Sequence, residues 1–482
     1  MNKYCIYPLL FFPLVAYASN ETKDEIHPNV LFILVDDMGY GDLSCTGSRF
    51  YETPNIDRLA SESMSFQAAY AACPVSSPSR AAIMTGKYPA RINLTDYIPG
   101  NQAYGPHKNQ KLSSLPFKHH LDLSEITIAK AFMEGGYSTF FAGKWHLGES
   151  WQYYPTAFGF EVNVGGNSSG HPRGGYFSPY KNPQLSDGPK GEYLTDRLTD
   201  ETINYIRAVR DKPFFAFLSY YAVHAPLQAS QEKIEKYKRK ALNANLKTSS
   251  LVKDGETCYK LSQDCAEYAA MIEHLDENIG RLLDVLEELK LNENTIVIFT
   301  SDNGGVATGN GRNVIATSNY PLRSGKGYLY EGGIRVPLFI RWQNQIVPSY
   351  CQEPVIGTDM YPTLLDLCGL PLLPNQHIDG ASLKPLLTGG QLNREAIYWH
   401  FPHYSGGLGG RPSSAIRMGD YKLIEFFEDF HVELYDVTHD VSEKKDLSKD
   451  KPDLKDCLLR KLNLWRRQVG ALYPINNSYY LE

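Results

Sequence analysis

Four continuous apolar runs constrain the fold of this chain more than any other feature of its sequence. They lie at residues 28–35, 137–142, 213–219 and 294–300 and are dominated by aliphatic and aromatic side chains. Runs of this length are typical of strands that are buried on both faces, as in a parallel sheet covered by helices. The sequence therefore predicts an α/β fold built around such a sheet.

The segments between these runs contain helical patterns. The clearest one places leucine and isoleucine at spacings of three and four from Ile272 to Leu289, with charged residues on the opposite face. This pattern leads directly into the apolar run at 294–300. Alternating strands and helices predict a doubly wound, mostly parallel sheet.

A second, smaller unit is expected after a change of composition at residues 370–374, where leucine and proline alternate. Because 482 residues exceed what one hydrophobic core usually supports, we expect a large domain at 25–370 and a smaller one at 371–482. The smaller domain is predicted to be an antiparallel sheet with one packed helix. Its strands and helix are expected at 414–418, 421–427, 432–435 and 453–469.

The N-terminus has the pattern of a signal peptide. A short basic start is followed by a largely apolar stretch from Tyr4 to Val15 and by Ala16-Tyr17-Ala18, which fits a cleavage site. We therefore expect residues 1–18 to be removed and the mature protein to be periplasmic or secreted. The rest of the chain has no segment long and apolar enough to predict membrane insertion.

The charge and cysteine content exclude several classes of partner. The formal net charge is −6 and there is no long basic run, which argues against nucleic acid or an anionic membrane as the main partner. The lysine-rich segment 233–253 is expected to be a solvated surface insertion. Without Cys5, seven cysteines remain and none has the Cys-x-x-Cys spacing of a zinc site. Cys258 and Cys265 are close enough for a disulfide, and free thiols fit the pattern equally well.

Carboxylate and amide side chains follow two of the apolar runs. Asp36 and Asp37 end the first run, and Asp302 and Asn303 follow the last one. Ligands of open α/β sheets bind at the carboxyl ends of the strands, so these side chains are expected to meet there. An all-oxygen set favours calcium or magnesium over zinc. The alternative is that both pairs only form turns.

A hydroxyl and an arginine flank a predicted helix start at Ser76-Ser77-Pro78-Ser79-Arg80. Residues 81–86 continue as a short helix that ends at a glycine, and free backbone N–H groups at such a helix start attract an anion. Arg80 adds further donors on the same side. The alternative is a surface turn that caps a helix.

Cationic and imidazole side chains complete the set. Lys144 and His146 follow the second apolar run, His224 follows the third, and Lys326 lies in a loop bounded by glycines. Each of them alone would be an ordinary structural or solvated residue. Together at strand ends they fit a clamp for a tetrahedral oxyanion, with a proton donor for a leaving oxygen.

These residues resemble the type I, formylglycine-dependent sulfatases of the alkaline-phosphatase-like superfamily. The family signature is Cys or Ser, any residue, Pro, Ser and Arg, followed by a helix that ends in Thr-Gly; it stands here at 76–80 with Thr85-Gly86. The chain is most similar to the arylsulfatase A and N-acetylgalactosamine sulfatase branch, in its bacterial serine-type form. The other matching segments are 35–39, 143–148, 301–305, Lys326 and 331–337.

The resemblance implies an alkaline-phosphatase-like fold and a modified nucleophile. Ser76 would be converted to formylglycine (3-oxoalanine) by a maturase that acts on serine, and its hydrate would supply the attacking oxygen. Cys73 misses the signature spacing, so it is not the modified residue. Calcium, in preference to magnesium, would be held together with residue 76. Its other ligands would be Asp36, Asp37, Asp302 and Asn303.

The resemblance also assigns roles to the cations and imidazoles. Arg80 would stabilise the formylglycine, and Lys144 and Lys326 would bind sulfate. His224 would protonate the departing sugar oxygen. His146 would take a proton from the second oxygen of the hydrate, which expels the sulfate.

The expected reaction is the hydrolysis of a sulfate monoester on a carbohydrate, possibly galactose or N-acetylgalactosamine. Segment 163–180 is expected to form a rim for the sugar, with His171 and Arg173 as substrate-binding residues and with Asn167 and Tyr176 nearby. His400 and His403 of the second domain are candidates to complete this rim. The alternative for each rim residue, which the residues alone favour, is a structural or solvent-facing position. Two alternatives remain open: a phosphate monoester or diester hydrolase on the same scaffold, and a sulfated-glycan binding protein in which Ser76 stays unmodified.

Overall fold

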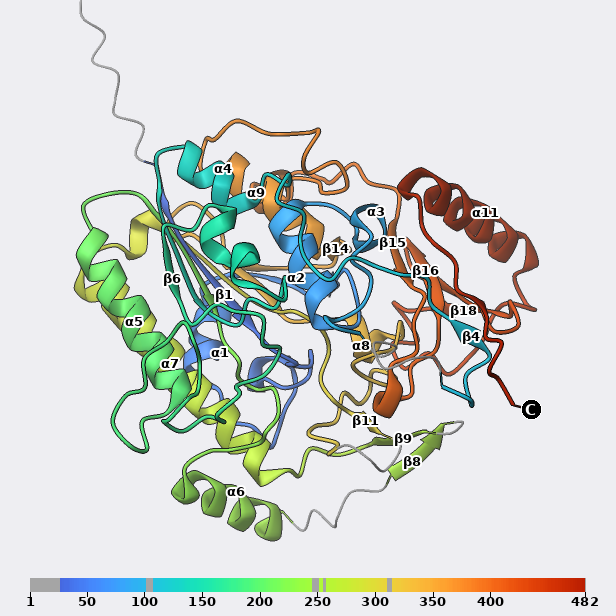
Figure 1. Cartoon of the computed structure of the whole chain (residues 1–482), viewed down its shortest axis with the longest axis horizontal. Coiled ribbons are helices and arrows are strands. Elements are labelled where there is room, and N and C mark those ends of the chain that lie inside the picture. Colours follow the sequence, from blue (N-terminus) through green and yellow to red (C-terminus); the bar gives the residue numbers. More distant parts are fainter. Residues whose placement is uncertain (1–26, 101–106, 245–250, 255–256, 310–313, 482) are drawn as a thin grey trace, which may run out of the picture.

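The computed structural model describes residues 27–100, 107–244, 251–254, 257–309 and 314–481. Its largest element is an eight-stranded sheet with β1 (Asn29–Val35) near the middle (Figure 1). The strand order is β13 (Ser349–Cys351), β2 (Met64–Phe66), β12 (Leu338–Arg341), β10 (Thr295–Ser301), β1, β7 (Phe214–Ser219), β5 (Ser138–Gly143) and β6 (Val162–Val164). The predicted signal peptide lies outside the described residues.

The sheet is mostly parallel, which confirms the predicted fold class. β1 pairs in parallel with β10 on one side and with β7 on the other, and β5 continues the sheet beyond β7. The antiparallel member is β12, which pairs with β10 and with β2. Because β1, β5, β7 and β10 run in one direction, the polar residues that follow them meet at one edge of the sheet.

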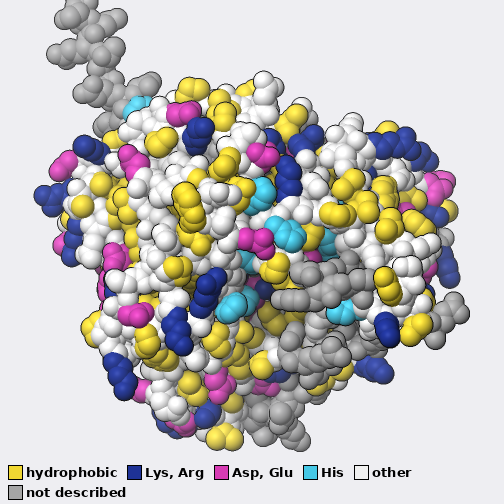
Figure 2. Space-filling view, viewed as in Figure 1, with side chains coloured by type: hydrophobic (Ala, Val, Ile, Leu, Met, Phe, Trp, Pro, Cys, Tyr) yellow, Lys and Arg dark blue, Asp and Glu magenta, His cyan; other side chains and the backbone are white. Residues whose placement is uncertain are grey.

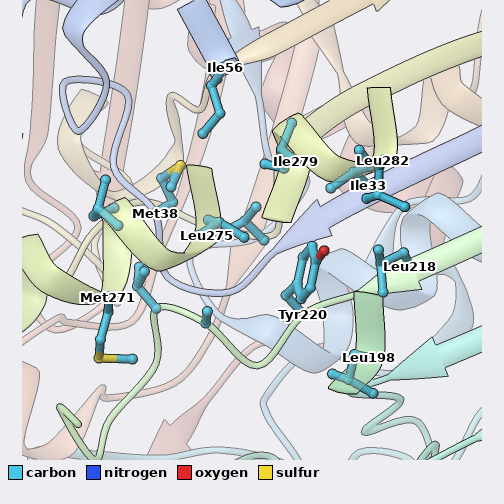
Figure 3. Close-up of a cluster of buried hydrophobic side chains, with 14 of the residues drawn as sticks. Ile33, Met38, Ile56, Leu198, Leu218, Tyr220, Met271, Leu275, Ile279 and Leu282 are labelled. Carbon is cyan, nitrogen blue, oxygen red and sulfur yellow. The ribbon is translucent and has the colours of Figure 1, made fainter. Parts of the chain in front are cut away.

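Helices cover both faces of the sheet, so its central strands are fully buried. Leu31 and Ile33 of β1 point into one core with α1 (Pro54–Ser61), α5 (Leu194–Val209) and α7 (Ala266–Glu288). Figure 3 shows part of this core, where Ile33 and Leu218 face Leu275, Ile279 and Leu282 of α7. Phe32 and Leu34 point the other way. They meet α2 (Ser76–Thr85), α4 (Ile128–Glu134) and α9 (Met360–Leu367).

A smaller antiparallel sheet forms a third core beside the large one (Figure 1). Its order is β15 (Ile397–Phe401), β16 (Ser413–Met418), β17 (Tyr421–Phe426) and β18 (Val432–Asp436), covered by α11 (Pro452–Val469). The sequence pattern anticipated all of these elements except β15. Leu383 and Leu387 still pack in the core of the large sheet, so the change of core comes between Leu387 and Ile397.

The first half of segment 233–253 is not the solvated excursion that its lysines predicted, and residues 245–250 lie outside the described residues. This first half lies in α6 (Gln231–Asn243), which packs along α7 and buries Ile234 and Tyr237. Lys233 and Lys236 pair with Glu273 of α7 at 2.9 and 2.7 Å. The long lysine side chains surround a narrow apolar stripe, and this stripe determines how the helix packs.

The remaining short elements connect these layers. They are α3 (Pro89–Ile92), α8 (Glu331–Ile334), α10 (Lys384–Leu387), β3 (Ala69–Tyr70), β14 (Val355–Ile356), β4 (Leu112–Ser113), β19 (Ile475–Asn476), β8 (Leu251–Asp254), β9 (Thr257–Lys260) and β11 (Thr308–Gly309). The last three form a small sheet of their own. Across the described part of the chain, no helix combines the length and the apolar character that crossing a bilayer requires.

Candidate active site

Helix α2 places Ser76 at the carboxyl edge of the large sheet. The helix begins at Ser76 itself, slightly earlier than the position of Pro78 indicated, and all of its residues are buried. It ends at Gly86, which has a φ of 66°. A Cβ at Gly86 would lie 2.4 Å from Cβ of His377, so this helix end needs glycine for both its conformation and its packing.

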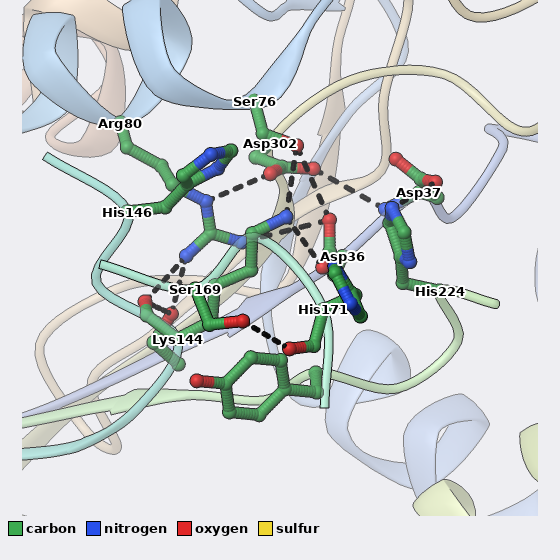
Figure 4. A network of polar contacts seen from close by, with 12 residues as sticks. Asp36, Asp37, Ser76, Arg80, Lys144, His146, Ser169, His171, His224 and Asp302 are labelled. Carbon is green, nitrogen blue, oxygen red and sulfur yellow. Dashed lines mark hydrogen bonds and ion pairs between the residues drawn. The ribbon is translucent and has the colours of Figure 1, made fainter. Parts of the chain in front are cut away.

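Three carboxylates converge beside Ser76, as the strand ends predicted. Asp36 and Asp37 follow β1, Asp302 follows β10, and one oxygen of each lies within 4.8 Å of the others. All three side chains are buried. The backbone N–H of Asp37 donates to Oδ1 of Asp302 at 3.2 Å, which ties the two strand ends together (Figure 4).

Each carboxylate has one cation close to it. Nε of Arg80 donates to Asp302 at 2.9 Å, Nζ of Lys144 to Asp36 at 2.7 Å, and Nζ of Lys326 lies 2.6 Å from an oxygen of Asp37. The formal charges of these six groups therefore balance. A bound divalent cation would leave the cluster with an excess of two positive charges, which suits an anionic ligand.

The hydroxyl of Ser76 lies inside this cluster. Its Oγ is 3.3 Å from Oδ1 of Asp36 and 3.3 Å from Oδ1 of Asn303, and it accepts a hydrogen bond from Nζ of Lys144 at 3.1 Å. The amide nitrogen of Asn303 donates to Asp37 at 2.8 Å, so the amide oxygen faces Ser76. The structure thus brings together every residue that the sequence predicted as a metal ligand.

Burial and the neighbouring cations pull the pKa values of the carboxyls in opposite directions. Burial raises the pKa of Asp36 to about 7, against the opposing effect of Lys144. Burial also acts to raise the pKa of Asp302, but Arg80 and Lys144 outweigh it and lower that pKa. A buried cluster in which one carboxyl is hard to ionise lacks positive charge, and a hard cation with oxygen ligands would supply it.

The two predicted imidazoles both lie in buried surroundings, which favour the neutral form of each ring. Burial, with a smaller effect of Lys144, lowers the pKa of His146 well below its usual value. Burial lowers the pKa of His224 to about 3, although Asp37 acts against this shift. Nδ1 of His224 donates to the carbonyl of Ala225 at 2.7 Å, so its Nε2 faces Asp37 at 3.7 Å.

A cavity of about 720 Å³ opens onto Ser76, Lys144, His146, His224 and Lys326. His171 and Arg173 line it, as the sequence predicted for the sugar rim. Histidine side chains gather near the centre of the face of the molecule shown in Figure 2. The other lining residues, which the sequence analysis did not identify, include Tyr97, Ile98, Val306, Val314, Ser405 and Leu408.

Four other predicted rim residues do not reach this cavity. Asn167 and Tyr176 are buried, and the hydroxyl of Tyr176 donates to backbone carbonyls of Tyr221 and His224. His400 bonds Ser414 and the carbonyl of Leu472, and His403 bonds Thr95. The small domain instead contributes its glycine-rich loop at 405–408. The glycines of that loop are the sequence signal that could have identified it as part of the cavity wall.

Comparisons with known proteins agree with this geometry. The family model described as "Sulfatase" matches residues 28–370, and the model "N-sulphoglucosamine sulphohydrolase, C-terminal" matches residues 324–468. A protein of Formosa agariphila named "Sulfatase" is 31% identical, over 96% of this chain and 93% of its own length. N-acetylgalactosamine-6-sulfatase of Canis lupus familiaris is 30% identical, over 82% of this chain and 71% of its own.

A solved structure shares the fold over most of both chains. The crystal structure of Ps i-CgsB in complex with k-i-k-neocarrahexaose superimposes with a TM-score of 0.73 at 30% identity. The match covers 91% of this chain and 92% of the other. The likeness therefore includes both the large sheet and the small antiparallel domain.

Proposed function

The chain belongs to the sulfatase family and is a sulfuric ester hydrolase, and from this premise we propose that it removes sulfate from a carbohydrate with a formylglycine made from Ser76. The observation that carries the proposal is the position of Ser76, within hydrogen-bond distance of a carboxylate, an amide oxygen and a lysine at the floor of a large cavity.

The residues present fit calcium. Asp36, Asp37, Asp302 and Asn303 offer only oxygen atoms, and the oxygens of the three carboxylates lie close enough to share one ion. Among the described residues, the group that could hold the ion consists of carboxylates, which favours calcium or magnesium over zinc. When bound, the ion would offset the charge of the sulfate and lower the pKa of an oxygen on residue 76.

The surroundings of Ser76 also fit a formylglycine hydrate, which carries one oxygen more than serine. Among the described residues, Nη2 of Arg80 and Nδ1 of His146 are buried without a hydrogen-bond partner. Buried polar atoms are normally paired, so both atoms are available to form hydrogen bonds with a group that serine lacks. A hydrated aldehyde would supply two oxygens on one carbon, one to attack the sulfur and one whose deprotonation releases the sulfate.

The three cations would hold the anion and orient it. Nη1 of Arg80 donates to the carbonyl of Lys144 and to Oγ of Ser219, which fixes the guanidinium beside residue 76. Lys144 and Lys326 both line the cavity, and their ammonium groups would bind the sulfate oxygens. Their present carboxylate partners would be neutralised by the metal ion instead.

The imidazoles would move the protons. Nε2 of His224 would hand a proton to the sugar oxygen that departs. Because His224 is neutral without substrate, it would gain this proton when the sulfate binds, since a nearby negative charge raises the pKa of an imidazole. Nδ1 of His146 would accept a proton from the second oxygen on residue 76.

The substrate we propose is a sulfated galactose or N-acetylgalactosamine unit. Relatives named N-acetylgalactosamine-6-sulfatase and a structure in complex with k-i-k-neocarrahexaose support a saccharide. The cavity, with polar groups at its floor and Tyr97 and Leu408 among its walls, suits a ring that has both hydroxyl and apolar faces. We also propose that the protein is exported and that a maturase acting on serine prepares it.

Two measurements test this function. Mass spectrometry of the protein from its native host should show residue 76 about two mass units lighter than serine. A panel of defined sulfated monosaccharides should then show release of sulfate from galacto-configured members. Only unmodified serine would favour a glycan-binding protein, and a large preference for aryl phosphate over aryl sulfate would favour a phosphate ester hydrolase.

A further inference from the structure

His146 is held by a segment of the chain that has no part in the proton transfers described above. The segment is 165–171, which follows β6 and leads into the rim of the cavity. His146 has a φ of 59°, a conformation that costs energy in a residue other than glycine. Its backbone N–H donates to the carbonyl of Asn167 at 3.1 Å, so the segment fixes the backbone of His146.

A hydrogen bond to the backbone of Ile98 orients the ring of His146. Its Nε2 donates to the carbonyl of Ile98 at 2.7 Å, because a carbonyl can only accept. Nε2 therefore carries the proton and Nδ1 has the free lone pair. The backbone N–H of Ile98 in turn donates to Oγ of Ser77 at 3.1 Å, which holds this peptide in place.

Gly170 lies directly against the same ring. A Cβ at position 170 would lie 2.5 Å from Cε1, 2.8 Å from Nε2 and 3.0 Å from Nδ1 of His146. The φ of Gly170 is outside the left-handed region, so an L-residue is allowed by the backbone. The side chain of His146 is thus what excludes a larger residue from position 170.

Segment 165–171 is itself held rigidly. Oδ1 of Asn167 accepts from the backbone N–H of Ser169 at 2.7 Å, and its Nδ2 donates to Oδ1 of Asn182 and the carbonyl of Gly165, both at 2.9 Å. Oγ of Ser169 donates to the carbonyl of His171 at 2.7 Å. Gly170 therefore cannot easily move away from the imidazole.

We propose that Gly170 is a positioning residue for His146: segment 165–171 holds the imidazole against the carbonyl of Ile98, which fixes the Nε2–H tautomer and leaves Nδ1 as the proton acceptor. The role of His146 as a base rests on the proposed function, whereas the contact itself does not. A methyl group at position 170 pushes the ring off Ile98 and displaces Nδ1.

The first test compares Gly170→Ala with Gly41→Ala in the full-length protein. Gly41 is also outside the left-handed region, and a Cβ there meets nothing within 4 Å. At equal formylglycine content, Gly170→Ala should lower kcat by about tenfold to a hundredfold and change KM by less than about threefold. Gly41→Ala should leave both near their original values. A higher KM with unchanged kcat in Gly170→Ala would mean that Gly170 only lines the substrate cavity, and would overturn the proposal.

The second test needs no activity and uses protein in which residue 76 is still serine. ¹⁵N NMR of histidine-labelled protein, with His146 assigned from its loss in His146→Ala, should show the Nε2–H tautomer. Gly170→Ala should alter this signal, and Gly41→Ala should not. An unaltered signal in Gly170→Ala would contradict the proposal even if the enzyme acted on a different substrate.

A double-mutant cycle isolates the contact between the two residues. Gly170→Ala should lower the free energy of unfolding when His146 is present and have little effect in the His146→Ala background, where the clashing ring is gone. An equal loss in both backgrounds would place the clash elsewhere and overturn the proposal. This cycle can be read whether or not the protein is a carbohydrate sulfatase.

Discussion

At the scale of single residues, the site combines groups that would be unstable if they were buried alone. Asp36, Asp37 and Asp302 are charged side chains in the interior, and each is tolerated because a cation lies next to it. Ser76 shares this environment, so its chemistry is set by its neighbours and not by its own hydroxyl. Changes at Ser76 and changes to the ion content should therefore have separable effects.

Replacing Ser76 with alanine should abolish turnover and keep binding. The variant loses the side chain that becomes the nucleophile but retains Lys144 and Lys326, so kcat should fall by at least about a thousandfold. Calorimetry with a sulfated monosaccharide should give a dissociation constant within about threefold of the unconverted serine form. Ser61→Ala, at the exposed end of α1, is the control and should behave as the original protein. Residual turnover of the Ser76 variant would remove Ser76 as the nucleophile.

Removal of calcium should lower both activity and stability. A chelator should stop sulfate release and reduce the melting temperature, because an ion at the proposed site would bind the folded protein and not the unfolded chain. Calcium should restore both properties more fully than magnesium. Protein that is extensively dialysed against chelator and still melts at the same temperature would argue against a metal at Asp36, Asp37 and Asp302.

At the scale of elements, the position of α2 depends on how the helix ends. Gly86 and Gly470 close α2 and α11 with the same φ of 66°. A Cβ at Gly86 would meet His377, whereas a Cβ at Gly470 would meet nothing within 4 Å. Comparing substitutions at the two glycines therefore separates the free-energy cost of the left-handed conformation from that of a clash with His377.

Gly86→Ala should destabilise the protein more than Gly470→Ala. The conformation alone should cost about 1–2 kcal/mol at either position. The clash at Gly86 should add about 1–3 kcal/mol, since overpacking at a buried site forces neighbours to move. Denaturant unfolding measures both values. Equal losses would show that His377 moves aside without cost and does not fix α2.

The sequence predicted helices and strands correctly where an element is buried on all of its faces. β1 and β10 are apolar on both faces, so the sequence predicted both as strands of a parallel sheet. The proximity of Asp36 and Asp302 followed from their positions at the ends of these strands. Prediction from the sequence failed where long polar side chains hide a narrow apolar stripe, as in α6. For His400 the sequence left a structural position and a rim position open, because nothing in a sequence distinguishes a histidine that bonds inward from one that faces a ligand; the structure shows the structural position.

At the scale of the whole molecule, a buried ionic network links the small sheet to α8. Glu331 of α8 and Glu443 both bond Nζ of Lys422 in β17 at 2.7 Å, and none of the three is exposed to solvent. Burial raises the pKa of Glu443 from 4.5 to about 7, although Lys422 acts against this shift. Two carboxyls thus share one lysine at the contact between the domains.

The stability of the protein should fall as this carboxyl ionises. Because the pKa of Glu443 is higher in the folded state than in the unfolded state, its contribution is complete below about pH 4.5 and is lost as the pH rises to about 7. The loss should be on the order of 1–3 kcal/mol. Unfolding free energies measured across this range should fall less steeply with pH in Glu443→Gln than in the original protein.

The matched control is Glu395→Gln, which removes the exposed carboxylate of a surface pair with Lys461. Such a pair contributes little, so this variant should keep the slope of the original protein. A slope in Glu443→Gln as steep as in the original protein would assign it to other groups. Lys422→Met should cost about 3–5 kcal/mol at neutral pH, because it leaves two carboxyls buried without their cation.

The burial of α2 also determines when Ser76 can be modified. Ser76 is 2% exposed at the floor of the cavity, and the helix that carries it is buried along its length and packs against α3, α4 and α9. Any enzyme that must grip the 76–80 segment can do so only while this part of the chain is still extended. The proposed modification would therefore have to take place during biosynthesis, before this part of the chain folds. A molecule that folds with serine at position 76 keeps it until it unfolds again.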